Sequence, residues 1–324
     1  MQKHKFILNI RMPVKKIGIT ALVPPELIFA CGAVPFDVNN VIPSSRKYPG
    51  NKLCAWTAIW KEMLVKKEIN VDSLIVVAGG DCHNALVDGQ KAAMSGIPTH
   101  FFFYPFDGDS VYMESQLHML SEFLGGIKRP EKFKEIRELK KQGQILDKKR
   151  CCGKLSPGEA FRILISFSDL AGDLAGFSRM ISALEEKDID LMNRIALIGV
   201  PPIYHDFHEV AHSLGLHIVF DELPYEFIRH GGTTIQEMAH DYCGYTFARP
   251  LEFRIDFLKK ELEMRKVDGV IHYTQFACHH MLEDEIMREK LDYPMLTIQG
   301  DLPGNTPQQI KLRLEAFREM LDRL

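Results

Sequence analysis

The stretch VDGVIHYTQFACHHMLED, residues 267–284, gives the clearest indication of the fold. Its first half is a short apolar run typical of a buried strand, and its second half has the mixed composition of a helix start. Cys278, His279 and His280 lie between the two halves. Because ligands bind beyond the carboxyl ends of the strands in an open α/β sheet, this loop is a candidate site.

A second stretch, VDSLIVVAGGDCHNALVD at residues 71–88, has the same order of features. An apolar strand is followed by Cys82 and His83, which open a helix. The paired glycines before Cys82 permit a tight turn that exposes backbone N–H groups. Two such units, far apart in the sequence, suggest one site built from two halves of the chain.

Strand-like and helix-like segments alternate in both halves of the chain. Residues 73–78 and 97–104 are strand-like in the first half, as are residues 194–200 and 216–220 in the second. Each is followed by a segment with helical spacing. This alternation predicts an α/β fold with mostly parallel sheets and helices on both faces.

The length of 324 residues suggests two domains. We expect an N-terminal α/β domain over residues 1–128, which carries Cys54 and Cys82. A C-terminal α/β domain over residues 191–324 carries Cys278. Residues 129–190, which contain a highly charged helical stretch, form a helical connector between them.

The composition excludes several classes of protein. Hydrophobic residues make up 46% of the chain and charged residues 26%, as in ordinary globular proteins. A formal charge of −3 gives no electrostatic support for nucleic acid or an anionic membrane as partner. We find no apolar run long enough to cross a membrane and no secretory signal. The seven cysteines, an odd number in a long chain, favour a reduced, cytoplasmic protein.

Three cysteines lie where soft metal centres are commonly held. Cys82 and Cys278 follow strands, and Cys54 lies in the first turn of a helix predicted for residues 53–67, where the helix dipole favours a thiolate. None belongs to a C-x-x-C motif. The spacing alone therefore leaves an iron–sulfur cluster, a zinc site with mixed cysteine and histidine ligands, thiol catalysis and plain burial open.

Other motifs add less. Neither a glycine-rich dinucleotide motif nor a P-loop is present, so a bound dinucleotide or intrinsic ATP hydrolysis has no support. His205, Asp206, His208 and His212 form a histidine-rich helix start, which is best interpreted as a polar helix N-terminus near a cleft. Cys31 has apolar neighbours and is expected in the core.

Several segments together resemble one known family. The chain is similar to the 2-hydroxyacyl-CoA dehydratase and benzoyl-CoA reductase family, specifically to subunits like the D-component of 2-hydroxyglutaryl-CoA dehydratase. The similar segments are GITALVPPELIFACGAVPFDV (18–38), KLCAW (52–56), VVAGGDCHNALVD (76–88), GKLSPGEAF (153–161) and the stretch from 267 to 301.

This resemblance implies two flavodoxin-like domains that face a central cleft, and a dimer formed with a paralogous subunit or with itself. It implies that Cys54, Cys82 and Cys278 bind a [4Fe–4S] cluster with one open iron. The protein would be the iron–sulfur subunit of an oxygen-sensitive, low-potential lyase or reductase of anaerobic metabolism. An ATP-dependent activator protein would supply an electron that passes to a CoA-thioester substrate. Glu26, His83 and His279 are the candidates for catalytic residues.

Two alternatives stay open at this point. The same family contains double-cubane reductases of small molecules, whose [8Fe–9S] centre needs about twice as many ligands. Cys151, Cys152 and Cys243 would then be additional ligands. The other alternative is a non-catalytic scaffold or zinc-binding subunit that only pairs with a catalytic partner.

Overall fold

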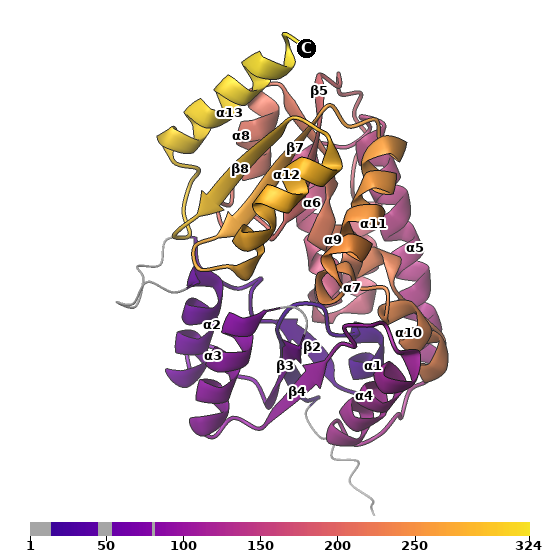
Figure 1. The fold of residues 1–324 in the computed structure, drawn as a ribbon. Helices are drawn as coiled ribbons and strands as arrows, with labels where there is room; N and C mark the ends of the chain where they lie inside the picture. Colours follow the sequence, from indigo (N-terminus) through magenta and orange to yellow (C-terminus); the bar gives the residue numbers. More distant parts are fainter. Residues whose placement is uncertain (1–13, 45–53, 80–81) are drawn as a thin grey trace, which may run out of the picture.

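A computed structural model describes residues 14–44, 54–79 and 82–324 (Figure 1). Within these residues, two sheets of four parallel strands are formed. The first has the order β2-β1-β3-β4, with β1 at Lys16–Ile19, β2 at Val34–Asp37, β3 at Ser73–Gly79 and β4 at Thr99–Phe103. The second has the order β6-β5-β7-β8, with β5 at Asn193–Gly199, β6 at Leu216–Asp221, β7 at Gly269–Gln275 and β8 at Met295–Gly300.

Both sheets repeat the same strand order, in which the first strand of each pairs with the second and the third. This is the start of the flavodoxin-like order, where ligands bind at the carboxyl ends of the strands beside the point of reversal. The predicted fold class, an α/β protein with two flavodoxin-like units, is confirmed. The domain limits at residues 128 and 190 stay a prediction.

Four helices accompany the first sheet among the described residues: α1 at Pro25–Ala30, α2 at Ala55–Val65, α3 at His83–Met94 and α4 at Ser110–Phe123. Pro25 opens α1, where a missing N–H costs nothing. The Cys82 side chain caps α3 by accepting a hydrogen bond from the Ala85 N–H. Two of the three candidate ligands, Cys54 and Cys82, are thus the residues at which helices begin.

The connecting region is dominated by α5 at Glu131–Cys151, which runs along both sheets (Figure 1). Further short helices follow: α6 at Pro157–Ile165, 3₁₀ turns at Ser166–Ser168 and Leu170–Gly172, and α7 at Leu174–Ser182. The segment from Leu170 to Ser182 is therefore not one continuous helix. Leu170 and Ala171 have positive φ angles of 52° and 51°, and the Asp169 carboxylate accepts a hydrogen bond from the Ala171 N–H, so the chain turns before α7 begins.

The second half of the chain forms α8 at Phe207–Ser213, α9 at Glu222–Arg229, α10 at Ile235–Tyr242, α11 at Leu251–Met264, α12 at Asp284–Leu291 and α13 at Gln308–Leu321. Two 3₁₀ turns, Thr246–Ala248 and His279–Glu283, lie among them. The helix start expected after Cys278 is thus divided into a 3₁₀ turn and α12. Helix α10 packs against α4, so the second half of the chain also covers the first sheet.

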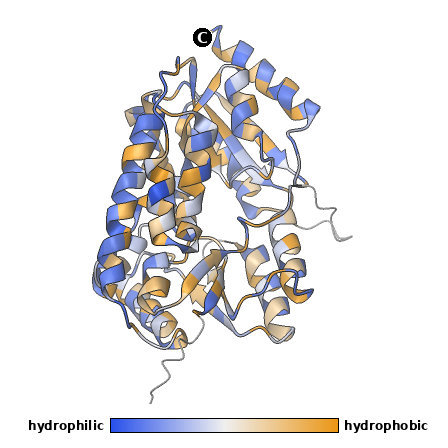
Figure 2. Ribbon diagram, turned by 180° about the vertical axis from the view of Figure 1, so that it is seen from behind, coloured by the Kyte–Doolittle hydropathy of each residue, from blue (hydrophilic) through white to orange (hydrophobic). Residues whose placement is uncertain are grey.

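Apolar clusters hold the two sheets together. Helix α2 contributes Ala55, Ile59 and Met63 to a cluster that also contains β5 and β7 residues such as Leu197 and Tyr273. Figure 2 shows apolar residues along the strands, while α5 and α13 present many hydrophilic ones. The helix that begins after Cys54 is therefore anchored on the opposite sheet.

None of the helices in the described residues combines the length and apolarity that crossing a membrane requires.

Candidate functional site

A cavity of about 360 Å³ lies where the carboxyl ends of the two sheets meet. Cys54, Cys82 and Cys278 all line it, although they come from three separate segments of the chain. Most of the wall is apolar, with contributions from Ile42, Trp60, Phe161, Ile165, Leu223 and Phe227. Polar side chains such as Asn40, Asn84 and Gln275 lie between them, and a mainly apolar wall with polar groups is the usual character of a site for a small ligand or cofactor.

The Cys54 thiol is the most enclosed of the three. Its residue is 5% exposed. Burial raises the pKa of the thiol to about 11, and the nearby Cys278 thiol acts in the same direction. Both thiols line the same cavity. Since a coordinating metal deprotonates a thiol outright, a cation at this position would reverse the effect of burial.

The Cys278 loop is tied to the helix that begins at Cys82. Asn84 Nδ2 donates to the carbonyl oxygen of Ala277 over 2.9 Å. Ala277 has a positive φ of 63°, and the Cys278 N–H closes the turn on the Gln275 carbonyl. The His83 and His279 rings meet edge to face at 5.3 Å between centroids. These contacts hold the two Cys-His loops against each other across the cavity.

A buried arginine supports the Cys278 loop from behind. Arg254 is 1% exposed, and its Nε and Nη2 donate to the two carboxylate oxygens of Glu222 over 2.6 and 2.7 Å. Glu222 also accepts from the Gly199 N–H at the end of β5. The Nη1 group of Arg254 contacts both His280 and Glu283. One guanidinium therefore fixes the ends of β5 and β6 and the loop after β7.

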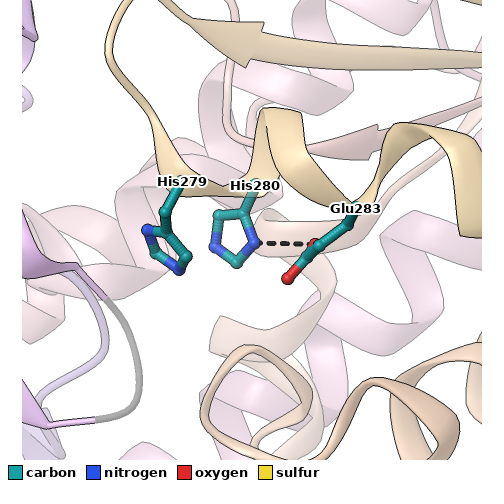
Figure 3. Close-up of side chains that lie close together, drawn as sticks. All are labelled: His279, His280 and Glu283. Atoms are coloured by element: carbon teal, nitrogen blue, oxygen red, sulfur yellow. Dashed lines mark hydrogen bonds and ion pairs between the residues drawn. The ribbon is translucent and has the colours of Figure 1, made fainter.

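His279, His280 and Glu283 form a cluster whose ligand atoms lie within 4.8 Å of one another (Figure 3). His280 Nδ1 is 2.9 Å from Glu283 Oε2. Burial alone would raise the pKa of Glu283, but the His280 hydrogen bond and the Arg254 charge lower it to about 2. Burial, with the neighbouring His280, lowers the pKa of His279 to about 4. Because Arg254 already supplies the positive charge here, the cluster is a poor metal site.

The spacing of the thiols bears on which metal they fit. Within the described parts of the chain, the cluster in Figure 3 is the group of three ligand atoms that converge to 4.8 Å. The sulfurs of Cys54, Cys82 and Cys278 do not form such a group, so at least two of them lie more than 4.8 Å apart. Thiolates on one tetrahedral zinc ion lie about 3.8 Å apart, given a Zn–S bond of about 2.3 Å, so this arrangement does not match a closed zinc site.

Comparison with known families decides the relationship. The family model for 2-hydroxyglutaryl-CoA dehydratase, D-component, matches residues 20–321, nearly the whole chain. The chain belongs to this family. The resemblance inferred from the sequence segments is thereby confirmed, and the chain is a subunit of the dehydratase type. No curated protein matches it.

As a member of a family defined by one component of a dehydratase, the chain works with further subunits. Its predicted catalytic candidates lie in different surroundings. His279 lines the cavity, whereas His83 is exposed and only touches the His279 ring. Glu26 is fully buried away from the cavity wall formed by the described residues, where it pairs with Lys140 over 2.6 Å and accepts a hydrogen bond from Tyr242.

The additional cysteines considered for a second cubane are also elsewhere. Cys151 ends α5, and its sulfur accepts from Arg194 Nη2 at 3.1 Å. Cys152 is exposed, and Cys243 is buried, which raises the pKa of its thiol to about 11. In the described part of the chain, the cavity wall contains none of the three.

The histidine-rich helix start is partly structural. His205 lines the cavity, but His208 Nε2 is 2.8 Å from the buried Asp221 carboxylate, and Asp206 accepts two hydrogen bonds from Thr306. The dehydratase-type chain has further cavity residues that the sequence interpretation did not single out, notably Asp37, Trp56 and Gln275. Asp37 follows the rule used for Cys82, because it ends a parallel strand.

Proposed function

We propose that this chain is the iron–sulfur subunit of an enzyme of the 2-hydroxyacyl-CoA dehydratase and benzoyl-CoA reductase type. The observation that carries the proposal is the presence of Cys54, Cys82 and Cys278 on one cavity, in a chain of the D-component family. These three residues would hold a [4Fe–4S] cluster. When bound, such a cluster supplies one-electron chemistry at low potential and leaves one iron without a protein ligand.

The surroundings of the thiols are suited to this role. Cys54 and Cys82 stand at the starts of α2 and α3, where backbone N–H groups and the helix dipole favour the negative charge of thiolates and sulfides. The large apolar part of the wall lowers the polarity around the thiols, and the apolar surroundings of an iron–sulfur centre tune its potential. The Asn84 hydrogen bond to the Cys278 loop keeps ligands from both halves of the chain in place.

The substrate under this proposal is a CoA thioester whose acyl end enters the cavity. The electron comes from an ATP-dependent activator protein, because the chain has no nucleotide-binding motif of its own. A paralogous subunit or a second copy of the chain would complete the enzyme. The neutral His279 ring and Gln275 on the cavity wall offer uncharged hydrogen-bonding groups to the thioester.

The test is ATP-dependent reduction of the anaerobically purified protein. With activator and ATP, electron paramagnetic resonance should show a reduced cluster, and omission of ATP should abolish the signal. Addition of 2-hydroxyglutaryl-CoA, the thioester that the family description contains, should then give dehydration. Zinc without sulfide in the purified protein would overturn the proposal and favour a scaffold subunit.

A further inference from the structure

Asp37 lines the same cavity as the three thiols. It ends β2, at the edge of the first sheet, and is paired in register with Ile19 of β1. The residue is 3% exposed, so its carboxyl group is almost wholly removed from bulk water. Asp37 is therefore an acidic group that a ligand in the cavity meets and solvent does not.

The contacts of Asp37 position this carboxyl group firmly. Oδ1 accepts from the Asn39 backbone N–H and from Asn39 Nδ2, both over 2.9 Å. The Ser168 hydroxyl lies beside the same carboxyl group and is itself held by Asn40. The Asp37 N–H donates over 2.9 Å to Asp169, a second buried carboxylate. All these donors are uncharged, so none of them fixes Asp37 as an anion.

The charges around Asp37 favour its protonated form. Burial and the neighbouring Asp169 raise the pKa of Asp37 to about 7. Burial also raises the pKa of Asp169, and the positive charge of Lys16 partly opposes this shift. The Lys16 ammonium group lies over the Phe36 ring, 3.3 Å from its centroid. A group that is protonated about half the time at neutral pH is well placed to give and to take protons.

Three other titratable groups of the wall, His279, His280 and Glu209, are less suited to donate a proton. Burial keeps His279 neutral, since its pKa falls to about 4. His280 is bound to Arg254 and Glu283. Glu209 is in an ion pair with Arg162.

We propose that Asp37 is the catalytic acid of this cavity, donating a proton to the departing hydroxyl group of a 2-hydroxyacyl thioester. The inference rests on the proposed function and adds a residue to it. In the step, the C–O bond breaks with its electron pair on oxygen, and the Asp37 proton joins that oxygen to form water. A proton leaving the β-carbon restores the acid, so the 2-hydroxyacyl thioester becomes a 2-enoyl thioester and water with no net electron consumed.

The test uses Asp37→Asn, which keeps the size of the side chain and an oxygen that accepts from Asn39. Iron content, sulfide content and ATP-dependent reduction should match the wild type, whereas turnover of 2-hydroxyglutaryl-CoA should fall by about 100-fold or more. Asp37→Glu should restore part of this loss. Asp256→Asn, on the exposed side of α11, is the matched control and should change nothing.

The pH profile separates a proton donor from a structural residue. Turnover should decline above the pKa of Asp37, and Asp169→Asn should move this decline to lower pH because a neighbouring carboxylate is removed. Unchanged turnover in Asp37→Asn, or loss of iron from it, would overturn the assignment.

A wild type without iron would instead refute the proposed function. If the wild type holds iron but does not act on this thioester, the assignment is tested by NMR. The protein is labelled with carbon-13 in its aspartate carboxyl groups, and their chemical shifts are followed as a function of pH. A carboxyl that titrates near pH 7 and is absent in Asp37→Asn supports the assignment, and titration at the ordinary value of 3.8 overturns it.

Discussion

Replacing Glu26 by glutamine should destabilise the protein without affecting its chemistry. Glu26 Oε1 is 2.6 Å from Lys140 Nζ, and the two side chains are 0% and 3% exposed. Removing one partner of a buried ion pair costs about 3–5 kcal/mol, because the remaining charge is left uncompensated. Lys140 keeps the His230 carbonyl at 3.0 Å and the Tyr242 hydroxyl at 2.8 Å as neutral acceptors. We therefore expect the lower end, about 3 kcal/mol.

The assay is equilibrium unfolding in urea followed by far-ultraviolet circular dichroism. With a denaturant slope of about 3 kcal/mol per molar, the midpoint should fall by about 1 M. The control is Glu26→Gln combined with Lys140→Met, which removes both charges and keeps the core filled. This double variant should regain about 2 kcal/mol over Glu26→Gln alone, since no unpaired charge is left.

Iron content and turnover per folded molecule decide between the structural and the catalytic role of Glu26. Both quantities should stay at the wild-type level in Glu26→Gln. A variant that is within about 1 kcal/mol of the wild type in stability but has lost turnover would refute the structural argument and restore Glu26 as a catalytic residue.

Three further predictions concern stability and the site. Burial alone would raise the pKa of Glu226, but Arg229 and His230 lower it from 4.5 to about 2. Its stabilising contribution, up to about 3 kcal/mol, is thus complete above pH 4.5 and lost as pH falls toward 2, and Glu226→Gln should flatten the acid limb of a stability–pH curve. Gly89→Ala should cost about 1–3 kcal/mol in urea unfolding, since the new methyl carbon would lie 2.6 Å from Val76, a stiff side chain on β3; equal or higher stability would show that α3 shifts freely. Asn84→Ala should release iron to a chelator faster than the wild type at unchanged initial iron content, because the bond to Ala277 is lost, and equal release rates would contradict the tie between the loops.

Local pattern explains what could be predicted from the sequence. The strand–Cys-His–helix order at Cys82 depends on hydrophobic periodicity and on the hydrogen bond from the Ala85 N–H to the Cys82 side chain. Both are local, since the capping bond joins residues only three positions apart. The parallel sheets follow from the alternation of such units. The same rule for strand ends placed Cys82 and Cys278 at one edge, and the family resemblance added Cys54.

Long-range pairing explains what was missed. Helix α9 was not predicted because Glu222, which is buried at its start, is compensated by Arg254, which lies 32 residues along the chain. Asp37 ends a strand, so the strand-end rule could have placed it at the site, but its buried surroundings could not be predicted. Its unusual environment arises from Asp169, 132 residues away, and nothing near Asp37 in the sequence indicates that contact.

The most direct test of the central claim is the iron and acid-labile sulfide content of anaerobically purified single cysteine variants. We predict about four iron atoms per chain in the wild type and in Cys152→Ala. Cys54→Ala, Cys82→Ala and Cys278→Ala should each lose most of this iron. Wild-type iron content in any of these three, or its loss in Cys152→Ala, would contradict a cluster held by the three thiols of the cavity.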